Sequence, residues 1–180
     1  FVTGRVKPIE SIKEKMALRG IKEENLAQDM QDIAGLRVMV QFVDDVEEVL
    51  DVLRKRHDMR IIQERDYIKN RKASGYRSYH VIIEYPVDTI NGNKIILAEI
   101  QIRTLSMNFW ATIEHSLNYK YKGEFPDEIK KRLEITAKIA YQLDEEMGKI
   151  RDDIQEAQAL FDPISRKLND GVGNSDDTDE

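Results

Sequence analysis

The chain has 180 residues, of which 41% are hydrophobic and 34% charged, and its formal net charge is −6. This length and apolar content are enough for one domain with a hydrophobic core and one appended element. The absence of cysteine excludes disulfides, zinc ribbons and thiol catalysis, and no apolar run is long enough for a membrane span or a signal peptide. We therefore expect a cytoplasmic protein without membrane contact.

Helices and strands are predicted in an interleaved order along the first 121 residues. Apolar residues at helical spacing predict helices over residues 8–19, 44–56 and 105–121. Strands are predicted over residues 33–42, 59–68, 74–85 and 94–103, with a hairpin turn at Asn91 and Gly92. Trp110, Phe109 and Ile113 are expected in the core. This order predicts an α/β or α+β fold with a mixed sheet covered by helices.

A long helix is predicted from Pro126 to about Phe161, ahead of Pro163. Its apolar residues recur at alternating spacings of four and three, which is typical of a narrow coiled-coil seam. Part of this seam can pack on the chain's own sheet, while its far end suits a partner helix. We expect three segments: a core over residues 1–125, a packing and oligomerisation helix over residues 126–163, and an acidic disordered tail over residues 164–180.

Polar side chains concentrate at one end of two strands that the hairpin makes adjacent. Strand alternation places Tyr76, Ser78 and His80 on one face and Arg77 and Tyr79 on the other, so the latter two are expected to be structural. On the next strand, alternation separates a polar row, Glu99, Gln101 and Arg103, from a core row, Ala98, Ile100 and Ile102. The polar rows predict a ligand site, and the alternative is the ordinary polar face of a half-exposed sheet.

Basic residues gather near this region. Arg37 lies inside an otherwise apolar strand, which requires either a binding site or a structural ion pair. Arg5 and Lys7 precede the first helix, and Lys15 lies on its Ser11 face, an arrangement that suits phosphate groups. A mobile basic terminus explains the same pattern equally well.

Two carboxylates, Asp32 and Glu99, are the expected Mg²⁺ pair, since magnesium needs few protein carboxylates when substrate phosphates complete its coordination. The three histidines show no metalloprotease spacing, so a zinc site is not expected.

Five segments together resemble the synthetase domain of the RelA/SpoT family: GRVKPIESI, QDIAGLRV, RDYIKNRKASGYRSYH, AEIQIRT and NFWATIEHSLNYKY. The matches run from about residue 5 to residue 122, and the short chain with a long C-terminal helix resembles the single-domain small alarmone synthetases of the RelQ type. The resemblance implies a nucleotidyltransferase-like mixed sheet of about five strands flanked by helices, with residues 1–125 as the catalytic core. It also implies transfer of the β,γ-pyrophosphoryl group of ATP to the 3′-hydroxyl of GDP or GTP, with Mg²⁺.

The resemblance assigns roles residue by residue. For ATP, Arg5 and Arg37 match the arginines that sandwich adenine, and Lys7, Ser11, Lys15 and Arg65 match positions near the phosphates. For the acceptor GDP or GTP, Tyr76 matches the tyrosine that stacks on guanine, Lys72 matches a phosphate contact, and His80 and Gln101 match neighbours of the nucleotide. Asp32 and Glu99 match the acidic pair that holds Mg²⁺, and Glu99 also matches the group that activates the 3′-hydroxyl.

Further properties follow from the same resemblance. Enzymes of the RelQ type form homotetramers, bind an alarmone effector and bind single-stranded RNA, and Phe1, Thr3 and Asn108 are the matching effector contacts. They also carry a helical segment ahead of TGRVKP, which we expect to be absent here. The hydrolase motif of the larger relatives has no counterpart, so synthesis without hydrolysis is expected. Two other functions stay open: nucleotidyl transfer to nucleic acid, and RNA binding by the basic segment over residues 60–79.

Overall fold

The structure, a computed structural model, describes residues 1–121 and 123–171, with side chains as far as residue 161. The chain divides into two units, Phe1–Asp144 and Glu145–Glu180. The first unit contains a sheet, four α-helices and the beginning of a fifth, α5 (Asp127–Gly171); the second contains the rest of α5. In the described part of the chain, no helix is long and apolar enough to span a membrane.

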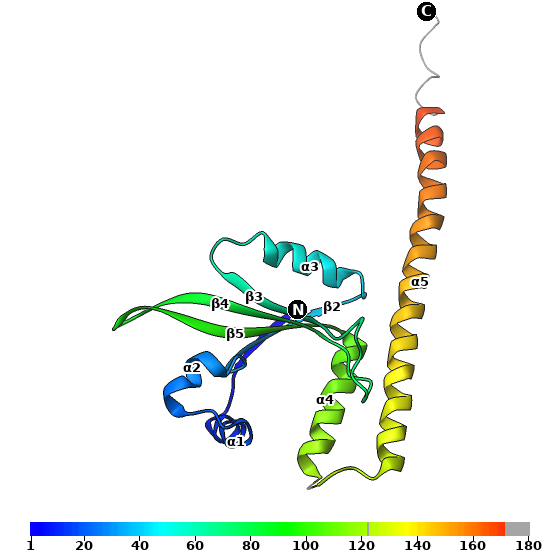
Figure 1. Cartoon of the computed structure of the whole chain (residues 1–180). Helices are drawn as coiled ribbons and strands as arrows, with labels where there is room; N and C mark the ends of the chain where they lie inside the picture. Colours follow the sequence, from blue (N-terminus) through cyan, green and yellow to red (C-terminus); the bar gives the residue numbers. More distant parts are fainter. Residues whose placement is uncertain (122, 172–180) are drawn as a thin grey trace, which may run out of the picture. The chain divides into compact units, whose positions relative to one another are not determined.

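The first unit is built on one five-stranded mixed sheet, as the sequence predicts (Figure 1). The strands are β1 (Val2–Val6), β2 (Ala34–Val40), β3 (Arg60–Asp66), β4 (Tyr79–Thr89) and β5 (Gly92–Thr104). Their order across the sheet is β1-β2-β5-β4-β3. The central pair β2 and β5 is parallel, and every other pair is antiparallel.

Helices lie on both faces of this sheet. α3 (Asp45–Arg54) covers one face, and α1 (Ile9–Arg19), α2 (Leu26–Asp29) and α4 (Leu105–Lys120) lie on the other side (Figure 1). A single 3₁₀ turn, η1 (Glu23–Asn25), precedes α2. α1 ends at Gly20, whose φ of 64° is the left-handed conformation that commonly closes a helix.

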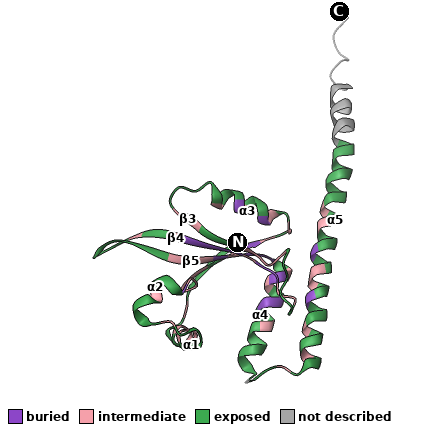
Figure 2. Ribbon diagram, viewed as in Figure 1, coloured by how far each residue is buried: buried purple, intermediate pink, exposed green. Residues whose placement is uncertain are grey.

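The main hydrophobic core lies between α3 and the sheet. Val46 and Leu50 of α3 are buried against Ala98, Ile100 and Ile102 of β5. Figure 2 shows buried residues on α3 and on the central strands, and these residues belong to one packed cluster. The core row predicted from alternation on β5 is therefore confirmed, and the opposite face of the sheet is free to carry polar groups.

A smaller cluster joins α4 to the start of α5. Trp110, Ala111 and Ala137 are buried there, and the indole nitrogen of Trp110 donates to the carbonyl of Leu133 at 3.2 Å. The expectation that Phe109 and Ile113 are also core is wrong, since they are 71% and 47% exposed. Only one stripe of α4 faces its neighbours, and a residue next to Trp110 is turned about 100° away from that stripe.

The structure differs from the sequence prediction at several elements, and α2, like β1, has no predicted counterpart. β1 was not expected, because a five-residue exposed strand has no alternating pattern and is defined only by its pairing with β2. The strand predicted from Ser74 begins at Tyr79, because Gly75 (φ 89°) sits in a turn. α5 runs to Gly171 rather than ending near Phe161, so Pro163 does not end the helix. Of the acidic tail expected over residues 164–180, the part up to Gly171 belongs to α5, and the part from residue 172 onward lies outside the described residues.

Candidate active site

One row of polar side chains crosses all five strands of the sheet. The register pairs Thr3 with Arg37, Arg37 with Gln101, Gln101 with His80, and His80 with Arg65. Residues directly opposite one another on neighbouring strands share a face, so these five lie together on the face away from α3. The strand pairing thus assembles predicted site residues that are separated by up to 98 positions in the chain.

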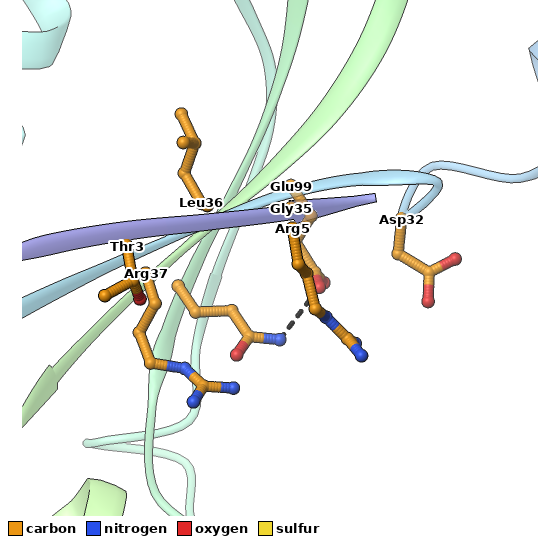
Figure 3. Close-up of a pocket in the computed structure, with 9 residues that line it drawn as sticks. Thr3, Arg5, Asp32, Gly35, Leu36, Arg37 and Glu99 are labelled. Carbon is orange, nitrogen blue, oxygen red and sulfur yellow. Dashed lines mark hydrogen bonds between the residues drawn. The ribbon is translucent and has the colours of Figure 1, made fainter. Parts of the chain in front are cut away.

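The row next to it surrounds a cavity of about 80 Å³. Its register pairs Arg5 with Gly35 and Gly35 with Glu99. In Figure 3, the side chains of Arg5, Arg37 and Asp32 extend to the same side of the strands, and Leu36 points the other way. This cavity is lined by Thr3, Gly4, Arg5, Asp32, Gly35, Leu36, Arg37, Glu99 and Gln101.

Asp32 is held at the cavity by two lysines. Lys15 Nζ lies 2.7 Å from Asp32 Oδ1, and Lys7 Nζ lies 3.1 Å from Oδ2. Partial burial alone would raise the pKa of Asp32, but the two ammonium groups outweigh it and leave the pKa below the ordinary aspartate value. Asp32 is therefore an ionised carboxylate at neutral pH, with two cations beside it.

Glu99 occupies the centre of a hydrogen-bonded chain. His80 Nδ1 lies 2.9 Å from Glu99 Oε1, and the Gln101 amide donates to Oε2 at 2.9 Å. Burial would raise the pKa of Glu99 and nearby Asp32 acts in the same direction, yet the contacts from His80 and Gln101 leave that pKa below its ordinary value. Glu99 is thus ionised and can accept a proton.

Arg37 has no acidic partner among the described residues. Its Nε is buried without a hydrogen-bond partner there, and burial together with nearby Arg103 and Arg5 lowers its pKa. The structural ion pair considered for this residue is therefore not formed. A guanidinium group kept half-buried beside other cations suits an anionic or π-electron ligand.

A second cavity, of about 420 Å³, adjoins the first and shares Arg5, Arg37 and Gln101 with it. Its volume is in the range that small-molecule ligands occupy. Residues from the loop after β3, from β5 and from α4 complete the lining: Lys72, Ser74, Tyr76, Arg103, Ala111, Thr112, Glu114 and His115.

Tyr76 stands at the edge of this second cavity in a fixed position. Its hydroxyl accepts from Arg103 Nη2 at 2.7 Å and contacts His80 Nε2 at 2.9 Å. Lys72 Nζ lies 5.0 Å from the centre of the Tyr76 ring. The two contacts of the hydroxyl hold the Tyr76 ring edge-on to the His80 ring. Lys72 lies beside the ring of Tyr76.

Comparison with known proteins places the chain that carries this site in a family. A family profile described as "Region found in RelA / SpoT proteins" covers residues 4–124. The chain belongs to the RelA/SpoT family.

Three relatives narrow this placement within the family. The chain is 56% identical to "GTP pyrophosphokinase YjbM" of Bacillus subtilis over 89% of its own length and 76% of that protein. A structure of a GTP pyrophosphokinase family protein from Streptococcus pneumoniae is 84% identical, with a TM-score of 0.82 over 91% of this chain and 80% of that one. The small alarmone synthetase 1 of Bacillus subtilis, bound to its product pppGpp, is 55% identical, with a TM-score of 0.83 over 86% and 79% of the two chains.

The other residues predicted for the site of this RelA/SpoT protein make fewer contacts with Asp32, Glu99 and Tyr76. Arg65 donates to Gln31 and Gln63, and Ser11 lies on α1 one turn before Lys15. Of the predicted effector contacts, Thr3 lines the first cavity and Asn108 accepts from Arg103 at 3.4 Å. Phe1 is 71% exposed, with its amino group bonded to the carbonyl of Met39. Their effector role stays a prediction.

Four lining or contact residues were not assigned from the sequence. Arg103 was placed on the polar row but given no role, although strand alternation alone puts it beside Gln101. Tyr67 contacts the His80 ring edge-on, with centroids 5.2 Å apart, and lies 4.8 Å from Lys72 Nζ. Glu114 and His115 line the second cavity from α4. No spacing signal marks Tyr67, Glu114 or His115, because each reaches the site only through tertiary packing.

The predicted division of faces before β4 is confirmed. Tyr76 and His80 point to the polar side, while Tyr79 packs on the α3 core and donates to Glu64 at 2.5 Å. Arg77 is 3% exposed and bonded to Asp144 of α5.

Proposed function

We propose that this protein transfers the β,γ-pyrophosphoryl group of ATP to the 3′-hydroxyl of GDP or GTP, forming ppGpp or pppGpp and AMP. Its membership of the RelA/SpoT family and its likeness to named GTP pyrophosphokinases support that reaction. The observation that carries it is the pair of adjoining cavities that share Arg5, Arg37 and Gln101, with Glu99 at the first. Two adjoining cavities, with an ionised carboxylate in the first, suit a donor and an acceptor nucleotide.

The first cavity is the proposed ATP site. Arg5 and Arg37 stack on adenine through their planar guanidinium groups, which suits a site without an acidic partner for Arg37. Lys7 and Lys15 contact the phosphates, since both ammonium groups already lie at the cavity beside Asp32. Ser11 and Arg65 are further phosphate contacts in this proposal.

The second cavity is the proposed acceptor site. The ring of Tyr76 stacks on guanine, and Lys72, 5.0 Å from its centre, neutralises the acceptor's phosphates. His80 and Gln101 border the acceptor next to Glu99. Stacking holds the base without using its hydrogen-bonding edges, and those edges remain for discrimination between bases.

The chemical step follows from the state of Glu99. The ionised carboxylate accepts the proton of the 3′-hydroxyl as that oxygen attacks the β-phosphorus of ATP; the bond from the β-phosphorus to the bridging oxygen breaks, and AMP leaves. His80 and Gln101 orient the two carboxylate oxygens. Arg and Lys side chains stabilise the negative charge that is distributed over the phosphoryl oxygens.

Magnesium fits this site by the chemistry of its donors. Asp32 and Glu99 both line the first cavity, and the pKa of each is below its ordinary value. No group of three or more acidic, His or Cys ligands occurs among the described residues, which agrees with a metal held by one or two carboxylates and substrate phosphates. Asp32 and Glu99 would hold the ion, which supplies charge neutralisation at the transferred group.

The organisation beyond the core is part of the same proposal. Residues 1–125 form the catalytic core, and α5 provides packing and oligomerisation in a homotetramer, with single-stranded RNA and an alarmone effector as further ligands. Apolar residues of α5 that are exposed in the described chain support the oligomerisation role: Ile139, Leu143, Met147, Ile150, Ile154 and Phe161. We propose that the protein synthesises the alarmone and does not hydrolyse it.

The test is a product assay with ATP labelled on the β- or γ-phosphate. Purified protein with GDP or GTP and Mg²⁺ should yield AMP and a 3′-pyrophosphorylated guanosine nucleotide, resolved by thin-layer chromatography. Glu99→Gln should remove product formation while the folded state persists. AMP joined to an RNA end, or tight RNA binding without turnover, would refute the proposal in favour of the two other functions.

A further inference from the structure

The loop between β3 and β4 carries Lys72 and Tyr76, and its shape is set by its own backbone. Gly75 N donates to the carbonyl of Lys72 at 2.8 Å, and Gly75 adopts φ 89°. Lys72 and Ser74 are exposed, so few contacts of the loop itself hold it in place. Its fixed position therefore depends on what lies behind it.

The first part of α5 lies beside this loop (Figure 1). A Cβ atom added at Gly75 would lie 2.4 Å from the Cβ of Ala137, closer than side chains can approach. Glycine is thus required at residue 75 for two reasons: the backbone has a positive φ, and α5 approaches too closely for a side chain. Neither feature involves a nucleotide.

A buried ion pair fixes the next part of the loop to the same helix. Arg77 Nη2 donates to Asp144 Oδ2 at 2.7 Å, and the two side chains are 3% and 6% exposed. Arg77 Nη1 is buried without a hydrogen-bond partner among the described residues. The carboxylate of Asp144 therefore neutralises the positive charge of Arg77. Breaking such a pair leaves a buried charge uncompensated.

Asp144 also contacts the junction of β5 and α4. The hydroxyl of Thr104 donates to Asp144 Oδ2 at 3.1 Å and accepts from the backbone nitrogen of Met107, which caps α4. One carboxylate on α5 therefore links the loop to the strand end that follows Arg103. Its two partners are the chain neighbours of Tyr76 and Arg103, which both line the second cavity.

Tyr141 adds a third contact, one helical turn before Asp144. The guanidinium carbons of Arg71 and Arg77 lie 4.9 Å and 5.1 Å from its ring centre. These are distances at which a cation is attracted to an aromatic ring. The residues on either side of Lys72 and Tyr76 are thus bound to α5.

We propose that Asp144 is a positioning residue for the acceptor nucleotide. By holding Arg77, it turns the adjacent Tyr76 toward the second cavity, because neighbouring side chains in extended backbone point to opposite sides. The inference rests on the proposed function for the identity of the acceptor. Under this proposal, residues 137–144 of α5 set the affinity for the acceptor. A substitution there would alter the position of the loop that binds guanine, although these residues do not contact the nucleotide.

The test compares Asp144→Asn with Glu145→Gln, a matched change at the exposed neighbouring acid. In steady-state assays, Asp144→Asn should raise the KM for GDP about tenfold, within the usual range of coupling between separate regions, with the KM for ATP changed less than about twofold. Glu145→Gln should change neither. Equal rises in both KM values, or none, would overturn the proposal.

A second readout does not require turnover. Trypsin cleavage after Arg71 or Lys72, followed by mass spectrometry, should be faster in Asp144→Asn than in the wild type or Glu145→Gln, because the loop opens more often. If the wild type makes no alarmone but this difference is present, the proposed function fails and the loop anchor stands. Equal cleavage rates would overturn the anchor itself.

Tyr141→Leu provides the measurement if Asp144→Asn does not fold. It leaves the Arg77 and Asp144 pair intact and removes the ring beside Arg71 and Arg77. The KM for GDP should rise without a matching rise for ATP. A folded Tyr141→Leu protein with both KM values unchanged counts against the proposal.

Discussion

Arg103 offers the sharpest test of how the polar face is held together, and the change is Arg103→Met. The side chain is 5% exposed and donates to four side-chain oxygens, those of Tyr76, Ser78, Gln101 and Asn108. Methionine keeps the apolar length of the side chain but donates no hydrogen bond. The variant thus isolates the guanidinium group from its packing.

The expected loss follows from these contacts. A hydrogen bond from a charged donor contributes about 1.5–3 kcal/mol, and removing the arginine also removes the free-energy cost of burying its charge. The bond to Asn108 is long at 3.4 Å, and Tyr76 keeps His80 as a partner. We expect the free energy of unfolding to fall by about 2–4 kcal/mol, with a higher KM for the acceptor.

Urea denaturation followed by circular dichroism measures this loss, and Arg60→Met is the matched control. Arg60 pairs with Glu84 at 2.6 Å, but its side chain is 73% exposed, so this change should cost at most about 1 kcal/mol. Similar losses in the two variants would refute the reasoning that burial of the Arg103 contacts is what stabilises the site.

Three further predictions use the same structure. Gly75→Ala should lower the free energy of unfolding by about 1–3 kcal/mol, because its Cβ would meet Ala137 at a positive φ; unfolding at wild-type urea concentration would contradict this. Tyr79 has its pKa raised to about 12 by burial and by its bond to Glu64, so its contribution is present below about pH 10 and lost as the pH rises from there toward 12. Tyr79→Phe should flatten the fall of Tm between pH 10 and 12, and a parallel fall would contradict it. Asp32→Asn should reduce product formation at least about 100-fold, and an active variant would exclude Asp32 from the metal site.

The face assignment shows how far strand alternation reaches. A two-residue period is enough to separate the polar row of β5 from its core row, and to separate Tyr76 from Arg77. The same rule places Arg103 on the polar row, although its contacts with Tyr76 and Ser78 come from a different segment of chain. Alternation predicts the direction of a side chain but not its partner.

Helix faces were harder to predict. Trp110 is buried as expected, yet Phe109 and Ile113 are exposed, because α4 contacts its neighbours along a narrow stripe whose position no local pattern marks. β1 was missed for a related reason. Five exposed residues form a strand only because β2 supplies the hydrogen bonds.

The sequence by itself determined the mixed sheet, its core face and the identity of the charged residues at the site, since these depend on short-range periodicity and on residue chemistry. It also predicted that Tyr76 and His80 share the face of a ligand site. Only the tertiary structure decided that Thr3, Arg37, Gln101, His80 and Arg65 form one row, because strand order and register join segments far apart in the chain. It alone revealed that Arg77 is anchored by Asp144, 67 residues away, since an ion pair between distant elements leaves no pattern in either of them.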